Sequence, residues 1–128
     1  MYARGLRALL IVHGFVTLAA AIVLAIAPGL IPSLVGVHLD RSANLVAYLL
    51  AGAELAIAVL SFGGARLSDR RALQLVAWTL IVFHGSSAAL EILAYIQGAS
   101  VAILNNVAAR AVIVALLAYL SRARAQAD

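Results

Sequence analysis

The chain has 128 residues, of which 66% are hydrophobic and 11% are charged, and its mean hydropathy is +1.10. A soluble domain of this length needs more polar side chains to cover its surface, so the composition excludes an ordinary soluble fold. The net charge of +4 does not indicate a nucleic-acid partner. The arginines stand singly or in pairs at the ends of apolar segments and form no continuous basic stripe.

Four apolar segments are long enough to cross a bilayer, which takes about 20 residues. They lie at about 6–27, 42–62, 72–96 and 101–120. We expect the first to end at Pro28-Gly29 and the second at Gly63-Gly64, because such residues interrupt helices. The first segment is too long for a signal peptide and three more follow it, so we expect it to be retained. The sequence predicts a single all-α domain over residues 1–128, an antiparallel four-helix transmembrane bundle.

The arginines also predict an orientation. On one side of the predicted membrane Arg41, in the loop 28–41, is the only arginine, and the turn 97–100 carries no charge. Because cytoplasmic loops carry an excess of basic residues, we expect both termini to be cytoplasmic. The absence of lysine and the abundant alanine suggest a GC-rich bacterial genome, and hence the bacterial inner membrane. The arginines assigned to the cytoplasmic side are Arg4, Arg7, Arg66, Arg70, Arg71, Arg122 and Arg124.

The loop 28–41 is itself fairly apolar, but Pro28, Pro32 and Gly36 interrupt it and it is too short to span. We expect it to lie along the outer interface or to cap the bundle, as a short amphipathic segment does.

Polar side chains inside the predicted spans are the candidate functional residues. An ionisable group at the centre of a membrane helix costs roughly 2.5–3.5 kcal/mol, so such groups face the bundle interior and find partners there. These residues are His13, Glu54, His84, Glu91, Asn105, Asn106 and Arg110.

A polar cluster is predicted in the outer half of the third and fourth spans. The turn between them centres near Gly98, which sets Glu91 level with Asn106 and Ser87 level with Arg110. His84, Ser87 and Glu91 share one helix face. We therefore predict a buried cluster, a candidate ligand or proton site, formed by His84, Ser87, Glu91, Asn106 and Arg110.

A second buried pair is predicted between the first two spans. The outer loop centres near Leu34, which places His13 about level with Glu54. Glu54 lies on a stripe of small residues suited to close helix contact. Its expected partner is His13, with Arg110 as the competitor.

Two interpretations of these polar groups stay open. They can be structural, since a buried Glu–Arg pair with neighbouring amides fixes the helix register. They can also form a binding pocket or a proton path. A bis-histidine haem is disfavoured because His13 is expected in the inner third and His84 near the middle. The sequence requires no cofactor, predicts no metal site and offers no catalytic motif such as G-x-S-x-G or a P-loop.

The segment from Tyr48 to Arg66, YLLAGAELAIAVLSFGGAR, resembles the second span of DoxX-like membrane proteins. In these small four-helix proteins a mid-helix glutamate precedes a small and aliphatic run, a glycine and a basic cytoplasmic turn. The layout of four spans, a proline-containing first outer loop and cytoplasmic termini is similar as well. Some members are associated with quinone-linked sulfur oxidation or methylamine oxidation, and others with redox stress through membrane partners. The resemblance maps Glu54 alone, and the cluster around Arg110 has no counterpart in it.

Three classes of function remain. The first is a non-enzymatic membrane component that binds a partner protein, a lipid or a quinone, within a larger complex or as a homo-oligomer. The second is a homo-oligomeric carrier for protons or a small solute. The third is an intramembrane enzyme acting on a lipid-soluble substrate with His84 and Glu91 as acid–base groups.

Overall fold

The computed structural model describes residues 2–122, with side chains from Arg4 to Ser121, and within this range it has helices and no strand. Four helices are long and apolar enough to cross a membrane, and a short helix lies in the first loop. The assignment of Arg124 to the cytoplasmic side lies outside the described residues, as does the side chain of Arg122. The elements are α1 (Tyr2–Ile26), α2 (Leu30–Leu34), α3 (Asn44–Arg66), α4 (Arg70–Ile96) and α5 (Ile103–Arg122).

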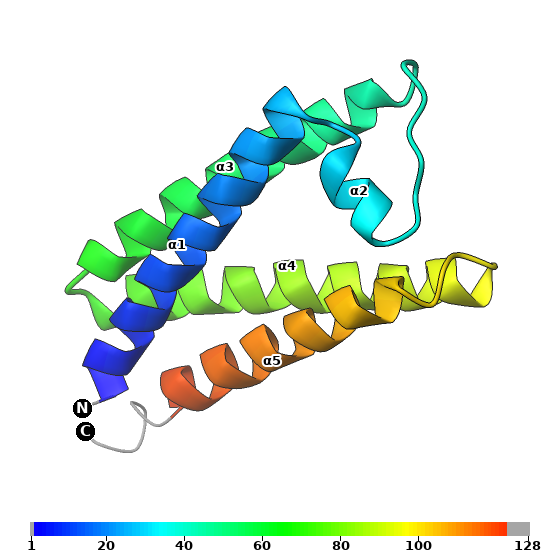
Figure 1. Cartoon of the computed structure of the whole chain (residues 1–128). Helices are drawn as coiled ribbons and strands as arrows, with labels where there is room; N and C mark the ends of the chain where they lie inside the picture. Colours follow the sequence, from blue (N-terminus) through cyan, green and yellow to red (C-terminus); the bar gives the residue numbers. More distant parts are fainter. Residues whose placement is uncertain (1, 123–128) are drawn as a thin grey trace.

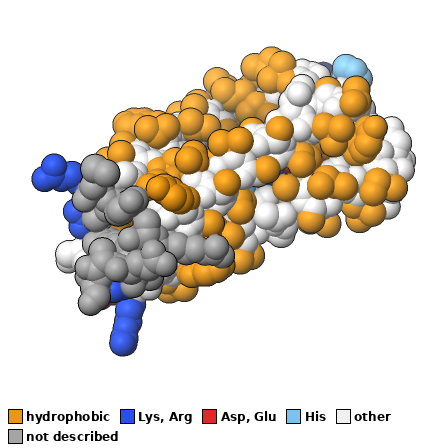
Figure 2. Space-filling model, turned by 90° about the horizontal axis from the view of Figure 1, so that it is seen from below, with side chains coloured by type: hydrophobic (Ala, Val, Ile, Leu, Met, Phe, Trp, Pro, Cys, Tyr) orange, Lys and Arg blue, Asp and Glu red, His pale blue; other side chains and the backbone are white. Residues whose placement is uncertain are grey.

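The four long helices form two antiparallel pairs, α1 with α3 and α4 with α5 (Figure 1). The pairs lie close together where α3 turns into α4, and they diverge toward the opposite end, where α2 lies between them (Figure 1). The start of α1 and the end of α5 meet at the first of these ends, since Gly5 packs against Leu120. We call it the arginine-rich end, and Figure 2 shows basic side chains gathered there. The opposite end is the loop end.

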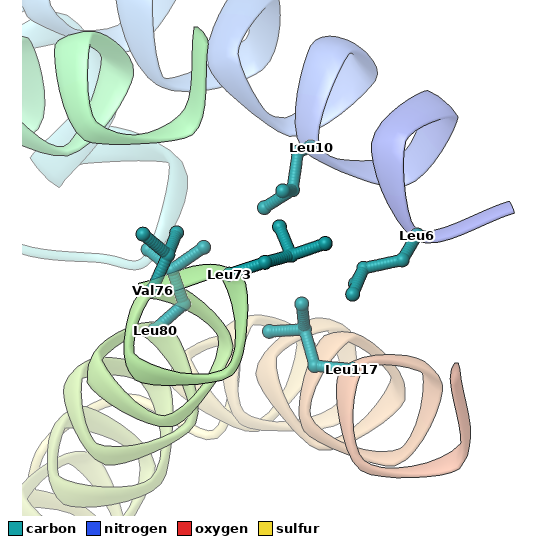
Figure 3. Close-up of a cluster of buried hydrophobic side chains, with 6 residues drawn as sticks. All are labelled: Leu6, Leu10, Leu73, Val76, Leu80 and Leu117. Carbon is teal, nitrogen blue, oxygen red and sulfur yellow. The ribbon is translucent and has the colours of Figure 1, made fainter. Parts of the chain in front are cut away.

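Leucine side chains close the bundle at the arginine-rich end. Leu6 and Leu10 of α1 meet residues of α4 and α5 there (Figure 3). A smaller cluster of Leu24, Ala47 and Ala51 joins α1 to α3 near the loop end. The middle of the bundle lies between these clusters and holds most of the buried polar side chains. We call the cluster at the arginine-rich end the leucine cluster; its members are Leu6, Leu10, Leu73, Val76, Leu80 and Leu117.

The outward faces of the helices are apolar. Large side chains such as Phe15 (62% exposed) and Leu75 (69% exposed) point away from the bundle, and orange dominates the surface in Figure 2. A soluble monomer rarely exposes contiguous apolar patches of this extent, whereas a bilayer covers them. The fold is therefore that of a multi-pass membrane protein.

The helix bounds differ from the expected spans in ways that have physical causes. Helix α3 does not end at Gly63-Gly64 but continues to Arg66. Gly64 lies where α3 touches α4, and a Cβ atom there would be 2.8 Å from Val76 Cγ1. The glycine therefore serves close packing rather than helix termination. Helix α4 begins before residue 72, because the side chain of Asp69 caps it by accepting from the backbone N–H of Ala72 at 2.7 Å.

The two adjacent glycines of α3 provide a matched test of this packing. Gly64→Ala is expected to destabilise the bundle by about 1–3 kcal/mol, because the added methyl group overpacks the contact with Val76. Gly63→Ala meets open space and is expected to be neutral or to stabilise by up to about 1 kcal/mol through helix propensity. Unfolding of both variants in mixed micelles measures the difference. Equal stabilities would show that α3 and α4 do not touch at Gly64.

The loop between α1 and α3 caps the loop end. Ile31 and Leu39 pack against the cluster of Leu24, Ala47 and Ala51. Gly36 has a φ of +77°, and a Cβ atom there would be 2.6 Å from the Cβ of Ser100 in the turn before α5. Glycine meets both demands, the left-handed backbone and the close approach. The loop therefore caps the bundle, which is one of the two positions expected for it.

Asp40 organises the approach to α3 outside the spanning segments. Its Oδ1 accepts from Ser42 Oγ at 2.6 Å and from the backbone N–H of Ala43 at 2.9 Å. These bonds to the charged form, Ser42 first, lower the pKa of Asp40 from its ordinary value. The stabilisation they give is present above the unfolded-state pKa and is lost as pH falls through the folded-state pKa. We expect Ser42→Ala to raise the Asp40 pKa in an NMR titration, and an unchanged value would contradict the bond.

Candidate functional site

Two buried histidines from different helix pairs meet in the middle of the bundle. His13 Nε2 of α1 lies 2.7 Å from His84 Nε2 of α4, and the two rings are nearly perpendicular, with an interplanar angle of 87°. His13 Nδ1 lies 2.9 Å from the Oγ of Ser61 on α3. Ser61 Oγ in turn donates to the carbonyl of Ile57 at 2.8 Å. The His13–His84 contact thus joins the α1–α3 pair to the α4–α5 pair.

The network continues from His84 toward the loop end. Arg110 Nη1 of α5 lies 3.2 Å from His84 Nδ1, and Arg110 Nε donates to Glu91 Oε1 at 3.0 Å. Asn106 Nδ2 donates to the same Glu91 oxygen at 2.6 Å. The guanidinium of Arg110 also lies 5.8 Å from the centre of the Phe83 ring. A continuous chain of polar contacts therefore passes through α3, α1, α4 and α5.

The chemistry of arginine fixes the direction of every bond in this chain. A guanidinium only donates, so His84 Nδ1 must accept and the ring proton of His84 must be on Nε2. His84 Nε2 then donates to His13 Nε2, which places the ring proton of His13 on Nδ1. That proton is donated to Ser61 Oγ, whose own hydroxyl proton goes to Ile57. One assignment satisfies all contacts, with both rings neutral and in opposite tautomers.

The chain occupies the central part of the bundle. Ser61 lies five residues before the end of α3 at Arg66, which is roughly 8 Å along the helix. Glu91 lies five residues before the opposite end of α4 at Ile96, again roughly 8 Å. The leucine cluster lies between the histidines and the arginine-rich end. The polar chain is therefore separated from that end by an apolar layer.

The structure brings together four of the five residues of the predicted outer cluster: His84, Glu91, Asn106 and Arg110. Ser87 is half-buried on the same helix, but its side chain makes no hydrogen bond within residues 2–122. Glu91 Oε2 is buried and has no hydrogen-bond partner in this part of the chain. The candidate site therefore has an acceptor atom left unused.

The predicted pair of His13 and Glu54 is not formed, because His13 bonds to Ser61 and His84 instead. Glu54 is 9% exposed and makes no hydrogen bond or ion pair with any residue in the range 2–122. Arg110 is the charged group that acts on it electrostatically. Arg110, the competitor considered in the sequence, therefore influences Glu54 without forming an ion pair with it.

Sequence reasoning missed Ser61 and the contact between the histidines. It placed the centre of the first loop near Leu34, as for a symmetric hairpin. The loop is asymmetric, because it contains α2 and packs over the bundle end. Ser61, almost two helical turns beyond Glu54, is thereby level with His13. The different depths expected for His13 and His84 are wrong as well, because the two rings are in direct contact.

The histidine geometry also bears on metal binding. Within residues 2–122 no group of three or more His, Cys, Asp or Glu side chains is placed to hold a metal ion. Two imidazoles on opposite sides of one metal ion have nitrogens about 4 Å apart, since each bond is about 2 Å long. His13 Nε2 and His84 Nε2 are 2.7 Å apart and bond directly. The arrangement fits a hydrogen bond and does not fit a bis-histidine haem.

Comparisons with known proteins add no identity to this geometry. No protein-family model matches the chain, and neither the curated proteins nor the solved structures gave a match.

Proposed function

We propose that this chain is a non-enzymatic, multi-pass membrane component of DoxX-like type that binds a lipid-soluble molecule of the quinol class. In this proposal it resides in the bacterial inner membrane with both termini in the cytoplasm, as the distribution of its arginines favours. The observation that carries the ligand proposal is the relation of Glu54 to Arg110.

Arg110 acts on Glu54 electrostatically, but the two side chains form no ion pair or hydrogen bond with each other. Both are largely buried in an apolar bundle, yet the ion pair of Arg110 is with Glu91. A carboxyl group taken out of water without a hydrogen bond is costly, so a native site supplies it with a partner. An ionised Glu54 only accepts and Arg110 only donates, so a group that binds both side chains donates to Glu54 and accepts from Arg110. A phenolic hydroxyl does both, and this favours a quinol over a fully oxidised quinone, which only accepts.

The route to the site favours a molecule dissolved in the bilayer. Glu54 belongs to the α1–α3 pair and Arg110 to the α4–α5 pair. The His13–His84 bond joins the pairs almost two helical turns nearer the arginine-rich end, and the leucine cluster closes that end. A ligand that parts the pairs from the membrane reaches Glu54 without crossing either cluster.

The bonding of the other polar groups favours binding over catalysis. Both ring nitrogens of His84 are engaged, one by His13 and one by Arg110. Glu91 Oε1 accepts from two donors. The enzyme alternative needs His84 and Glu91 to act together. Glu91 keeps one free oxygen, Oε2, but His84 has no free ring nitrogen.

Direct binding tests this proposal. Purified protein is titrated calorimetrically with a short-chain benzoquinol and with the matching benzoquinone. We expect the quinol to bind more tightly, and Glu54→Gln to weaken quinol binding at least tenfold. Asn105→Ala, at an exposed polar position of α5, is the matched control and should leave binding unchanged. Equal affinity of Glu54→Gln and the natural protein, or no binding of either molecule, would overturn the assignment.

Gentle purification tests the accessory role separately. Mass spectrometry of everything that leaves the membrane with the chain is expected to find a larger complex in fixed stoichiometry. Recovery of a homo-oligomer without other proteins would reject the accessory role, while the quinol titration would still decide the site.

Proton carriage by a homo-oligomer is the second candidate function, because the chain from Ser61 to Glu91 is continuous through the middle of the bundle. It ranks second because the leucine cluster separates this chain from the arginine-rich end. In liposomes, proton flux above that of empty vesicles, abolished by His13→Leu, would favour it. Flux equal to that of empty vesicles would reject it.

A further inference from the structure

We infer that a groove on the outer face of the α1–α3 pair binds an anionic phospholipid, with the headgroup phosphate on Arg66 and one acyl chain along the groove. The groove has a volume of about 260 Å³ and lies on the side of α1 opposite to His13, because Ile11 and Phe15 are each two residues away from it on that helix. It is therefore separate from the proposed quinol site. Its lining residues are Ile11, Phe15, Phe62, Ala65 and Arg66.

Two aromatic rings line the end of the groove that is farther from the arginine-rich end. Phe15 of α1 and Phe62 of α3 meet edge to face with ring centres 5.1 Å apart. The ring of Phe62 lies over Gly14, where a Cβ atom would be only 2.8 Å from it. The missing side chain of Gly14 thus lets Phe62 lie across α1. This leaves an apolar channel alongside Ile11, suited to a hydrocarbon chain.

Arg66 gives a positive charge to the other end of the groove, which lies at the arginine-rich end of the bundle. Arg66 is exposed in the last turn of α3 and makes no hydrogen bond or ion pair with the residues from 2 to 122. It lies at the arginine-rich end, where further basic side chains gather (Figure 2). Basic residues beside a membrane span attract anionic lipid headgroups by about 1 kcal/mol each. Arg66 therefore has a free guanidinium at the height of a phosphate.

The combination of both ends selects a phospholipid rather than a free phosphate. A free phosphate would meet Arg66 as the one basic side chain lining the groove and would leave the aromatic end unused. A phospholipid uses both ends. Its phosphate lies at the membrane interface, beside Arg66, and the acyl chain joined to it extends into the bilayer interior, along the aromatic rings. An anionic headgroup such as phosphatidylglycerol keeps its negative charge, whereas the choline group of phosphatidylcholine offsets the phosphate.

Native mass spectrometry of delipidated protein tests the site. We expect phosphatidylglycerol to bind several-fold more tightly than phosphatidylcholine, and Arg66→Gln to remove this preference. Arg71→Gln, an exposed arginine at the same end but outside the groove, is the matched control and should keep it. Phe15→Ala should weaken binding of both lipids, because it shortens the apolar end. Circular dichroism confirms that each variant is folded.

Three outcomes would overturn the inference. Equal losses in Arg66→Gln and Arg71→Gln would show a general attraction to the basic end. Full displacement of the lipid by millimolar inorganic phosphate would show a phosphate site. Unchanged binding in Phe15→Ala would show that the groove holds no acyl chain. None of these depends on quinol binding at Glu54, so the two proposals fail separately.

Discussion

Arg110→Leu is expected to cause the largest loss of stability of any single substitution considered for this chain, about 3–5 kcal/mol. The change leaves the Glu91 carboxylate without its counter-charge in the bundle interior and deprives His84 Nδ1 of its donor. Removing one partner of a buried pair is costly because the remaining charge stays desolvated. Unfolding in mixed micelles, followed by circular dichroism, measures the loss.

A double-mutant cycle separates this cause from simple loss of packing. Glu91→Leu alone leaves a buried guanidinium and should also destabilise, whereas the combination of Arg110→Leu and Glu91→Leu removes both charges together. We expect the double variant to be more stable than Arg110→Leu alone, since an apolar pair often replaces a buried ion pair at little cost. Additive losses would show that Glu91 and Arg110 do not depend on each other.

The four spanning helices could be predicted from hydropathy, because a bilayer of fixed thickness demands apolar segments of fixed length. The alignment of α4 with α5 could also be predicted from the sequence. Their connection is short, so residues at about equal distances from Gly98 lie level. In the structure Asn106 and Arg110 accordingly both bond to Glu91.

The alignment of α1 with α3 could not be obtained in the same way. Their connection is long and contains α2, whose packing over the bundle end sets the relative height of the two helices. Nothing in the local sequence gives this relative height. The predicted partner of His13 was therefore Glu54, whereas the partner in the structure is Ser61. The role of Gly64 could not be predicted either, because it depends on where the neighbouring helix lies. A glycine that ends a helix and a glycine that admits a neighbouring helix look alike until the neighbour is placed.

The direction of the hydrogen-bond chain leads to the second prediction with a large effect. Because Arg110 cannot accept, we expect ¹⁵N NMR of histidine-labelled protein to show His84 protonated on Nε2 and His13 on Nδ1. His84→Leu breaks two contacts between helices, and at about 0.6–1.7 kcal/mol for each such bond it should cost about 1–3 kcal/mol. Arg110→Leu frees His84 from this constraint and should let the two tautomers mix.

Glutamine at position 84 distinguishes a hydrogen-bonding role from a packing role. Its amide offers one acceptor for Arg110 and donors for His13, so His84→Gln can keep the direction of the chain, which His84→Leu cannot. We therefore expect His84→Gln to retain most of the stability that leucine loses. If the NMR spectrum instead placed the His84 proton on Nδ1, Arg110 could not donate to that nitrogen. The contact between α4 and α5 at this position would then be one of packing alone, and the direction assigned to every other bond in the chain would fall with it.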